Sequence, residues 1–478
     1  MQRSIAELLT TPEGKTFECK RDLSSPQNLL KTLVAFANSA GGLALIGVAD
    51  GTRNVIGLPE PLQAEEQLCN LIADGIAPRL VPNVELVAHG DLNLLLVEVF
   101  PSGQRPHHLI KQGPKQGVFV RLGSTNRQAD ATLIEELRRS VSGAAFDEQP
   151  IADLSVDDLD REAITAAFEG IRSINDQDLH SLRVLTRVQG RVVPTAGGVL
   201  LFGRDRERWF PDAWLQCARF VGTTKAGIFD QLDIHAPLPQ ALEQALAFLK
   251  KHAVRSADFQ ELRRVDRWSI PLASLREALT NALVHADYSQ RGAPIRVAFF
   301  DDRIEIENPG VLIPGLTIDD LPRGISRLRN RVISRVFREL GLIEQWGSGV
   351  PVILEEAASQ QLPSPVFEEV GLRFRVTLPL ATQPPAGQGQ SRIRGAESGA
   401  GSGAESLAAG SLAALVLQAL AQGPLSKSEI AQALGRDSVS GALNRTIRQL
   451  LDRDEIGYTL PETPNSRLQK YRLLRQPQ

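Results

Sequence analysis

The sequence predicts an α+β protein of several domains. Over residues 1–380, helical patterns with an apolar residue every three or four positions alternate with short strand-like runs. Residues 381–410 are rich in Gly, Ser, Ala, Pro and Gln, which is typical of a flexible linker. A last compact module follows at 411–478, so the length of 478 residues suits about three domains.

The composition is ordinary for a soluble globular protein, with 42% hydrophobic and 23% charged residues. No window reaches the roughly 18 uncharged apolar residues that a membrane span needs, so we expect a cytoplasmic protein without a membrane partner. The cysteines Cys19, Cys69 and Cys217 form neither a disulfide framework nor a CxxC metal pattern, and we expect reduced thiols and no structural metal. A net charge of −3 means that nucleic acid must be contacted by local basic patches.

The N-terminal region begins with a short amphipathic helix and a strand-like segment within residues 5–20. Residues 28–39 repeat apolar positions at helical spacing, and Gly41-Gly42 ends that helix. Residues 43–48 then predict a buried strand, which the turn residues Asp50-Gly51 close.

Four segments of this region resemble the Schlafen-like AlbA-type DNA-binding domain: EGKTFECK (13–20), FANSAGGLALIGVADG (36–51), VIGL (55–58) and VFVRLGSTNRQA (118–129). The resemblance implies such a domain over 1–145. Arg121, Thr125, Asn126 and Arg127 have side chains suited to phosphate oxygens. An alternative is that the Ser-Thr-Asn loop caps a helix over 131–141, and both interpretations can hold together.

The same resemblance suggests a second chemistry. Glu13, Glu18 and Asp50 match the carboxylates that nucleolytic Schlafen domains place around a divalent metal, and Lys20 lies beside them. The alternative is structural: Glu18 and Lys20, two apart on a strand, form an ion pair, and Asp50 serves the turn. Nuclease activity is therefore the lesser expectation.

Residues 146–194 are predicted to be a linker with connecting helices, because 146–160 is acidic and contains Pro150. A helix is expected over 160–171, and a strand pair lies before TAGGVLLFG (195–203). Residues 238–251 form a strongly periodic helix.

The segment REALTNALVHADYS (276–289) places Glu277, Asn281 and His285 at i, i+4 spacing, on one face of a helix. A solvated helix face is the alternative. A strand pair over 295–307 then ends in Asn308-Pro309-Gly310. The run WGSG (346–349) precedes an apolar helix-like segment, where glycines allow close backbone approach and the helix N-terminus favours an anion.

These motifs, with RNRVI (329–333) and GLIEQWGSGV (341–350), resemble the C-terminal domain of RecG-like transcriptional regulators. That domain is a divergent branch of the GHKL ATPases, an α/β sandwich. The resemblance covers 195–380 and implies binding of ATP and Mg2+. It implies that Asn281 holds the metal and that Glu277 orients the attacking water. The nucleotide-binding residues it implies are Asn281, His285, Asn308, Gly310, Gly347 and Gly349.

One sequence motif differs from that of the GHKL superfamily. Where the superfamily has Asp-x-Gly-x-Gly, this chain has Asn308-Pro309-Gly310-Val311-Leu312, so an amide replaces the carboxylate that reads adenine in the superfamily. We therefore expect weak or absent ATP hydrolysis. The basic segment RGISRLRNR (323–331) occupies the place of the superfamily's mobile lid, and a solvated helix face is its alternative. No GxxxxGK(S/T) loop occurs, which argues against a P-loop helicase.

The module 411–478 has the pattern of a winged helix-turn-helix, with three helices (411–421, 426–434, 438–453) and two strands (455–460, 468–474). The third helix would carry Asn444, Arg445 and Arg448 to DNA, and Arg467 and Lys470 would lie on the wing. From residue 436 onward, 8 Lys/Arg against 5 Asp/Glu favour DNA, and a protein-docking module is the alternative.

Together these features predict a nucleotide-responsive, DNA-binding transcriptional regulator that forms a homo-oligomer. Two alternatives remain open. One is a metal-dependent nuclease controlled by nucleotide, and the other is a nucleotide-switched protein-interaction module.

Overall fold

The computed structural model describes residues 4–49, 51–253, 255–258, 265–268, 270–343, 349–380, 412–421, 423–433, 446–447, 450–451, 455–459 and 470–474. The chain divides into two compact units, Met1–Gln388 and Gly389–Gln478. The predicted linker lies outside the described residues. No helix in the described ranges is both long and apolar enough to cross a membrane.

The N-terminal domain is built on a four-stranded sheet in the order β1-β2-β5-β4. Its strands are β1 (Phe17–Lys20), β2 (Gly42–Ile46), β5 (Leu92–Val99) and β4 (Asn83–His89), and its first helices are α1 (Ile5–Thr10), α2 (Pro26–Asn38) and α3 (Pro61–Gly75). Strand β1 runs parallel to β2, and the other pairs are antiparallel. The apolar face of α2 packs on β2 and β5 through Leu33, Phe36, Ile46 and Val97, as its helical spacing predicts.

A second group of short elements follows: β3 (Ile76–Ala77), β6 (His108–Leu109), η1 (Ile110–Gln112), α4 (Gly113–Gln116), β7 (Phe119–Leu122), β8 (Thr125–Gln128) and α5 (Ala131–Ser142). Strands β7 and β8 form an antiparallel hairpin. Asp130 caps α5, because its side chain accepts a hydrogen bond from the Leu133 N–H at 2.8 Å. The Ser-Thr-Asn loop is thus the hairpin tip and the start of β8, and it is not the helix cap.

The connecting segment contains η2 (Phe146–Glu148), η3 (Val156–Asp158), α6 (Arg161–Ala167), α7 (Asp176–Ser181), β9 (Leu185–Val188) and β10 (Arg191–Pro194). The predicted strand pair before TAGGVLLFG is β9–β10. Leu159, Ile164, Phe168 and Leu179 are buried in the same core cluster as the central domain. The segment is therefore packed onto that domain and contributes to its core.

The central domain contains a six-stranded sheet in the order β12-β11-β15-β16-β18-β17. The strands are β11 (Leu215–Phe220), β12 (Ile228–Ile234), β15 (Ile295–Phe299), β16 (Arg303–Pro309), β17 (Val366–Val370) and β18 (Arg373–Pro379). The helices are α8 (Ala196–Phe202), α9 (Arg206–Trp209), α10 (Leu238–His252), α11 (Leu272–His285), η4 (Ile318–Arg323), α12 (Arg331–Glu339) and α13 (Gly349–Ser359). A separate hairpin pairs β13 (Arg255–Asp258) with β14 (Val265–Trp268).

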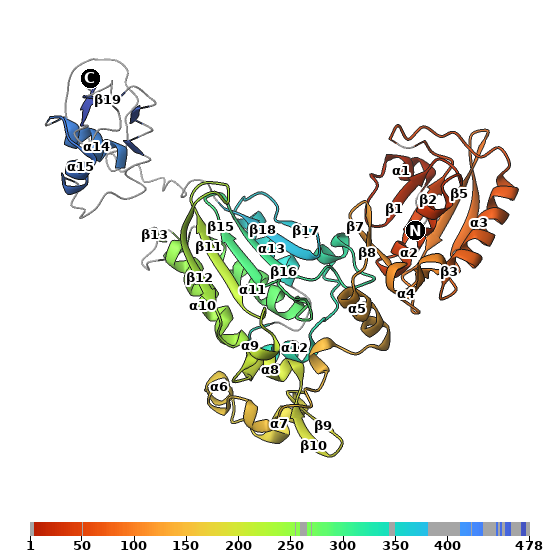
Figure 1. Cartoon of the computed structure of the whole chain (residues 1–478), viewed down its shortest axis with the longest axis horizontal. Helices are drawn as coiled ribbons and strands as arrows, with labels where there is room; N and C mark the ends of the chain where they lie inside the picture. Colours follow the sequence, from red (N-terminus) through yellow and green to blue (C-terminus); the bar gives the residue numbers. More distant parts are fainter. Residues whose placement is uncertain are drawn as a thin grey trace. The chain divides into compact units, whose positions relative to one another are not determined.

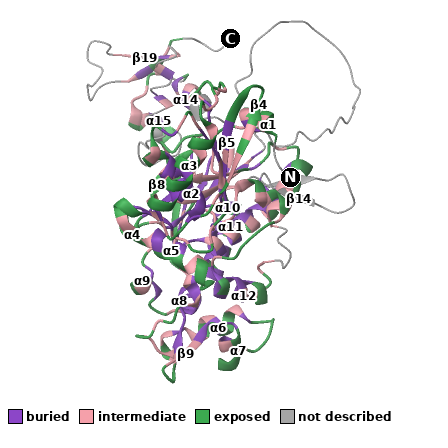
Figure 2. Ribbon diagram, turned by 90° about the vertical axis from the view of Figure 1, so that its right-hand side faces the viewer, coloured by how far each residue is buried: buried purple, intermediate pink, exposed green. Residues whose placement is uncertain are grey.

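Helices α10 and α11 lie against one face of this sheet, and α13 packs on α11 (Figure 1). That face contributes Cys217, Val297, Ile306 and Val376 to the core. Helix α8, the TAGGVLLFG segment, is buried along its whole length (Figure 2). The central site is therefore built on the covered face of the sheet.

The opposite face of the sheet carries charged groups that pair with one another. The side chains of Glu305 and Glu307 project there and meet Arg303 and Arg375, with Arg303 Nε at 2.8 Å from Glu305 and Arg375 Nε at 2.8 Å from Glu307. Alternation along β16 explains this, because Ile304 and Ile306 point to the core.

The C-terminal unit contains α14 (Leu412–Leu420), α15 (Lys427–Ala433) and the antiparallel pair β19 (Ile456–Tyr458) and β20 (Tyr471–Leu473). The predicted capping box before α15 is present, since the Ser426 N–H donates to Glu429 Oε2 at 2.7 Å and the Glu429 N–H donates to Ser426 Oγ at 3.3 Å. Most of the predicted third helix lies outside the described residues, and only 446–447 and 450–451 are seen to be helical.

Candidate functional site

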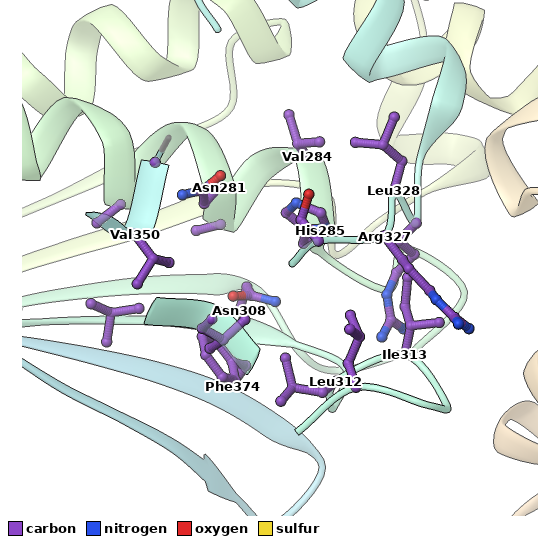
Figure 3. A pocket seen from close by; sticks show the side chains of 18 of the residues that line it. Asn281, Val284, His285, Asn308, Leu312, Ile313, Arg327, Leu328, Val350 and Phe374 are labelled. Carbon is purple, nitrogen blue, oxygen red and sulfur yellow. The ribbon is translucent and has the colours of Figure 1, made fainter. Parts of the chain in front are cut away.

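A cavity of about 240 Å3 lies between α11, the end of β16 and the start of α13. This volume is close to the lower end of the roughly 300–1,000 Å3 of small-molecule pockets. Figure 3 shows Asn281, His285, Asn308 and Arg327 among its lining residues. The apolar part of the wall comprises Ile306, Leu312, Ile313, Leu316, Ile353, Phe367, Phe374 and Val376. The cavity thus combines an apolar wall with a few polar groups, as ligand sites do.

Helix α11 places Glu277, Asn281 and His285 along the cavity, as their i, i+4 spacing predicts. Its opposite side buries Leu275 and Leu279 in the core. The Asn281 amide Nδ2 donates to Glu277 Oε1 at 3.0 Å, and its amide oxygen accepts no hydrogen bond from the residues that the structure describes. The three side chains are half-buried in the cavity wall, so this is not a solvated helix face.

Gly349 begins α13 directly beside these groups. A Cβ atom on Gly349 would lie 2.0 Å from Glu277 Oε1 and 3.2 Å from the Asn281 amide nitrogen. Only glycine lets the backbone come this close while Glu277 keeps its position. Gly347, the other predicted glycine of WGSG, lies outside the described residues.

His285 is held neutral in the cavity. Burial, with a smaller contribution from the Arg329 guanidinium, lowers the pKa of His285 to about 4. A neutral imidazole can accept or donate one hydrogen bond without adding charge.

The NPG turn forms the next part of the wall. Asn308 is buried, and its Nδ2 donates to the Pro309 carbonyl at 3.1 Å, while its amide oxygen accepts no hydrogen bond from the described residues. Gly310 has a φ of +98°, and its N–H donates to the Leu372 carbonyl at 2.9 Å. The amide of Asn308 carries no negative charge to present to a ligand.

The basic segment 323–331 is not a helix over its length. It ends η4 at Arg323, continues irregularly through 324–330 and starts α12 at Arg331. Arg327 and Arg329 line the cavity, with Arg327 Nη1 3.1 Å from the Pro314 carbonyl. The predicted solvated helix face is therefore replaced by a cavity wall that carries two cations.

Ser334, Arg338 and Phe374 are among the lining residues that no sequence motif identified. Ser334 and Arg338 lie on the α12 face toward the cavity, and Phe374 reaches it from β18. The only sequence signal was the apolar periodicity of α12, which cannot show what a polar position on the helix faces.

The predicted metal site of the N-terminal domain has a different arrangement. Glu18 is buried and pairs with Lys20 through Oε1 and with Arg121 through Oε2. The Glu13 carboxylate accepts the Cys19 N–H at 2.9 Å. Asp50 lies outside the described residues. In the described part of the chain, no three His, Cys, Asp or Glu side chains gather as metal ligands.

Arg121 was predicted to contact DNA, but its side chain is only 1% exposed. Its Nε donates to the Gly14 carbonyl at 3.0 Å and its Nη1 to Asn126 Oδ1 at 2.9 Å. The structure thus places Arg121 as an internal partner of Glu18, away from solvent, because a buried carboxylate requires a cation beside it.

The other residues predicted to contact DNA differ in how far they are exposed. Thr125 and Arg127 are exposed on β8, whereas Asn126 is half-buried and its Nδ2 donates to Thr32 at 2.9 Å. Lys470 is half-exposed and pairs with Glu429 at 3.0 Å. Asn444, Arg445, Arg448 and Arg467 lie outside the described residues. The structure thus leaves Arg127 as the exposed basic group of the β7–β8 hairpin.

Comparison with known proteins identifies three parts of the chain. Family models match residues 13–130 ("Schlafen, AlbA_2") and 292–378 ("Putative ATP-dependent DNA helicase recG C-terminal"). A third matches 413–474 ("Filamentation induced by cAMP protein Fic-like, C-terminal domain"). The chain combines a Schlafen AlbA_2 domain with a RecG-related C-terminal domain. A Fic-like C-terminal domain follows them.

The RecG-related match begins after α11. It includes Asn308, Gly310 and Gly349, but not Glu277, Asn281 or His285. The Schlafen AlbA_2 and RecG-related combination is typical of transcriptional regulators and DNA-binding proteins. The Fic-like match covers the predicted winged helix and was not anticipated from the sequence.

Among solved structures, the DIP2311 protein from Corynebacterium diphtheriae is 18% identical over 93% of this chain and 91% of that chain, with a TM-score of 0.43. The N-terminal domain of a "Putative ATP-dependent DNA Helicase RecG-related Protein" from Nitrosomonas europaea is 26% identical, over 27% of this chain and 94% of that one, with a TM-score of 0.22. At these TM-scores neither structure supports a conclusion about this chain. No curated protein matches it.

Proposed function

We propose that the chain is a nucleotide-responsive, DNA-binding transcriptional regulator whose RecG-related domain binds ATP in the cavity beside α11. The observation that carries the proposal is the meeting of Glu277, Asn281 and Gly349 at the polar end of an otherwise apolar cavity. Apolar walls suit a base and sugar, and the cations Arg327 and Arg329 suit phosphate.

The polar groups of the cavity fit a nucleotide with its metal. Asn281 presents an amide oxygen, the type of ligand that Mg2+ prefers, and phosphates and water would complete its coordination. Bound Mg2+ would offset the charge of the phosphates. Ser334 Oγ and Arg329 Nε are buried without a hydrogen-bond partner in the described part of the chain, so the cavity holds donors that a ligand can satisfy.

We expect ATP hydrolysis to be slow or absent, so that the nucleotide acts as a switch. Glu277 lies one helical turn before Asn281, within reach of a water near a phosphate held there. The neutral Asn308 holds the base less specifically than a carboxylate, and poor positioning loses much of the rate. Rapid phosphate release that disappears in Glu277→Ala would contradict the switch.

The test of nucleotide binding is calorimetry of Mg·ATP with the full chain. We expect binding by the wild type and a loss of about tenfold or more in Asn281→Ala, in line with the loss of a group at a metal site. Asn83→Ala is the matched control, because the Asn83 amide also donates to a glutamate (Glu85, 2.9 Å) but is exposed on β4. Absence of binding by the wild type, or equal loss in both variants, would refute the assignment.

DNA binding is proposed for the β7–β8 hairpin of the AlbA_2 domain and for the C-terminal module read as a winged helix. Phosphate contacts make affinity fall with salt, by a slope of about 0.9 per contact. We expect Arg127→Ala to lower that slope by about one contact, and removal of 411–478 to weaken binding further. Identical salt titrations for the truncated chain and the full chain would exclude the C-terminal module as a DNA contact.

The nuclease alternative gains no support from the site, because Glu18 is already neutralised by Lys20 and Arg121. A homo-oligomer remains a prediction.

A further inference from the structure

The guanidinium of Arg329 joins the cavity to α5 within the unit Met1–Gln388. Helix α5 directly follows the AlbA_2 match (13–130) and packs against Val118 and Val120 of it, so we count it with the AlbA_2 domain. Its Nη1 pairs with Glu136 on α5, and its Nη2 donates to the carbonyl of Val311 in the cavity wall. Its Nε has no partner in the described part of the chain. The side chain is 8% exposed, so this is a buried cation whose Nε–H is not used by any described residue.

Glu136 is also left incomplete by this pairing. Its carboxylate is largely buried, and Oε2 has no partner among the described residues. Asp287 Oδ2 lies 3.9 Å from the same Arg329 Nη1, so two carboxylates face one guanidinium. Burial raises the pKa of Glu136 to about 7, with Asp287 adding to the rise and Arg329 and Arg139 opposing it. Glu136 and Asp287 therefore share one cation, and Glu136 keeps a carboxylate oxygen without a partner among the described residues.

The wall beside Arg329 makes two more contacts with the AlbA_2 domain. The Gly315 N–H donates to the Ser39 carbonyl, the C-cap of α2, at 3.0 Å. The Leu312 N–H donates at 2.8 Å to Glu369 Oε1, which also pairs with Lys15 at 2.6 Å. Residues 311–315 thus line the cavity on one side and hold the AlbA_2 domain on the other.

We infer that Arg329 is an anion-binding residue of the cavity and that Glu136 of the AlbA_2 domain competes with the ligand for it. This inference rests on the proposed nucleotide site. A phosphate that takes the free donor of Arg329 draws the guanidinium from Glu136, and the contact between α5 and the cavity wall weakens. Because coupling between two sites is reciprocal, events in the AlbA_2 domain that hold Glu136 in place oppose nucleotide binding.

The test compares the affinity of the full chain for Mg·ATP with that of Glu136→Gln. The titrations are made above the pKa of about 7 that burial gives Glu136, where its carboxylate is charged. Glutamine keeps the size of the side chain but removes the competing charge, so we expect Kd to fall by about fivefold or more, the lower end of typical coupling. Glu135→Gln is the matched control, because Glu135 lies on the same helix and pairs with Arg138 but is exposed. Its Kd should stay within about twofold of the wild type. Arg329→Gln should weaken binding in both backgrounds.

A second measurement covers the case in which Glu136→Gln does not fold. Hydrogen exchange of the wild type should rise in 131–142 when Mg·ATP saturates the chain, since the ligand releases α5. Binding with unchanged Kd in Glu136→Gln, or with unchanged exchange in α5, would overturn the competition and leave the nucleotide site standing. Absence of binding by both the wild type and Glu136→Gln would overturn the nucleotide site and this inference with it. Binding by Glu136→Gln alone would support both.

Discussion

Two clusters of polar residues, one around Glu18 in the AlbA_2 domain and one around the RecG-related cavity, differ in how completely they are paired. Glu18 is matched by Lys20 and Arg121, and Arg121 has further partners in Gly14 and Asn126. The cavity leaves donors on Ser334 and Arg329 unpaired among the described residues. Satisfied buried networks hold a fold together, whereas unsatisfied ones call for a functional explanation.

The largest expected effect comes from removing one partner of Glu18 in the fully paired cluster. Arg121→Leu leaves a buried carboxylate with Lys20 as its remaining cation, so we expect a loss of about 3 kcal/mol in the free energy of unfolding, the lower end for a broken buried pair. Urea denaturation of the wild type and the variant measures it. Arg127→Leu, on the exposed side of the same hairpin, is the control and should change stability by less than about 0.5 kcal/mol. Equal stabilities of the two variants would show that the Arg121 pair is not structural.

The sequence predicts regular elements well where periodicity and end signals agree. The helices at α2, α10 and α11 and the buried strand β2 are all present, as is the Ser426–Glu429 capping box. The prediction failed for the cap of α5, because Asp130 lies closer to the helix start than the Ser-Thr-Asn loop. The core contribution of residues 159–185 was also missed, because 146–194 was predicted as a linker with connecting helices, and a sequence does not show which partner buries the apolar residues of such helices.

A second, smaller effect on stability is expected from His285 in the cavity. Burial holds the pKa of His285 near 4, below its ordinary value of 6.5. Between these two pH values His285 binds a proton in the unfolded chain but not in the folded chain. The contribution of neutral His285 to the free energy of unfolding is therefore complete above pH 6.5 and is lost as the pH falls toward 4. From pH 7.5 to 5.5 we expect His285 to contribute a loss of about 1 kcal/mol.

Urea denaturation at the two pH values measures this loss. His285→Gln should be less sensitive to pH than the wild type by that amount, whereas His89→Gln, exposed at the end of β4, should match the wild type. An unchanged pH dependence in His285→Gln would mean that the imidazole is not desolvated by the cavity.

The site itself was predictable only in part. The i, i+4 pattern placed Glu277, Asn281 and His285 on one wall, and the glycine of WGSG at 349 meets them. The pairing of Arg121 with Glu18 was not predictable, because the two residues are 103 positions apart and both also suit phosphate or metal chemistry. Ser334 and Arg329 needed the fold to show which way they face. A sequence pattern identifies groups able to bind a ligand, and only the structure shows which are already occupied.

The smallest predicted effect has opposite signs at two buried serines. Ser334 on α12 is fully buried at the cavity, and its hydroxyl has no partner among the described residues. Ser274 on α11 is buried with its N–H bonded to Glu356 at 2.6 Å and its hydroxyl on the same oxygen. Removing the paired hydroxyl takes one of two hydrogen bonds from the Glu356 carboxylate, so Ser274→Ala should cost about 1 kcal/mol. Removing an unpaired one relieves a desolvated group, so Ser334→Ala should leave stability equal or raise it by up to about 1 kcal/mol.

Urea denaturation of the ligand-free chain compares the two serine variants, and Mg·ATP calorimetry follows for Ser334→Ala. A functional hydroxyl predicts unchanged or higher stability together with weaker ligand binding, because the cavity then loses a donor that the ligand satisfies. A loss of stability in Ser334→Ala equal to that in Ser274→Ala would show that the hydroxyl is paired after all, for example by water. Ser334 would then be as fully hydrogen-bonded as the residues around Glu18, and it would no longer distinguish the ligand cavity from the paired structural cluster.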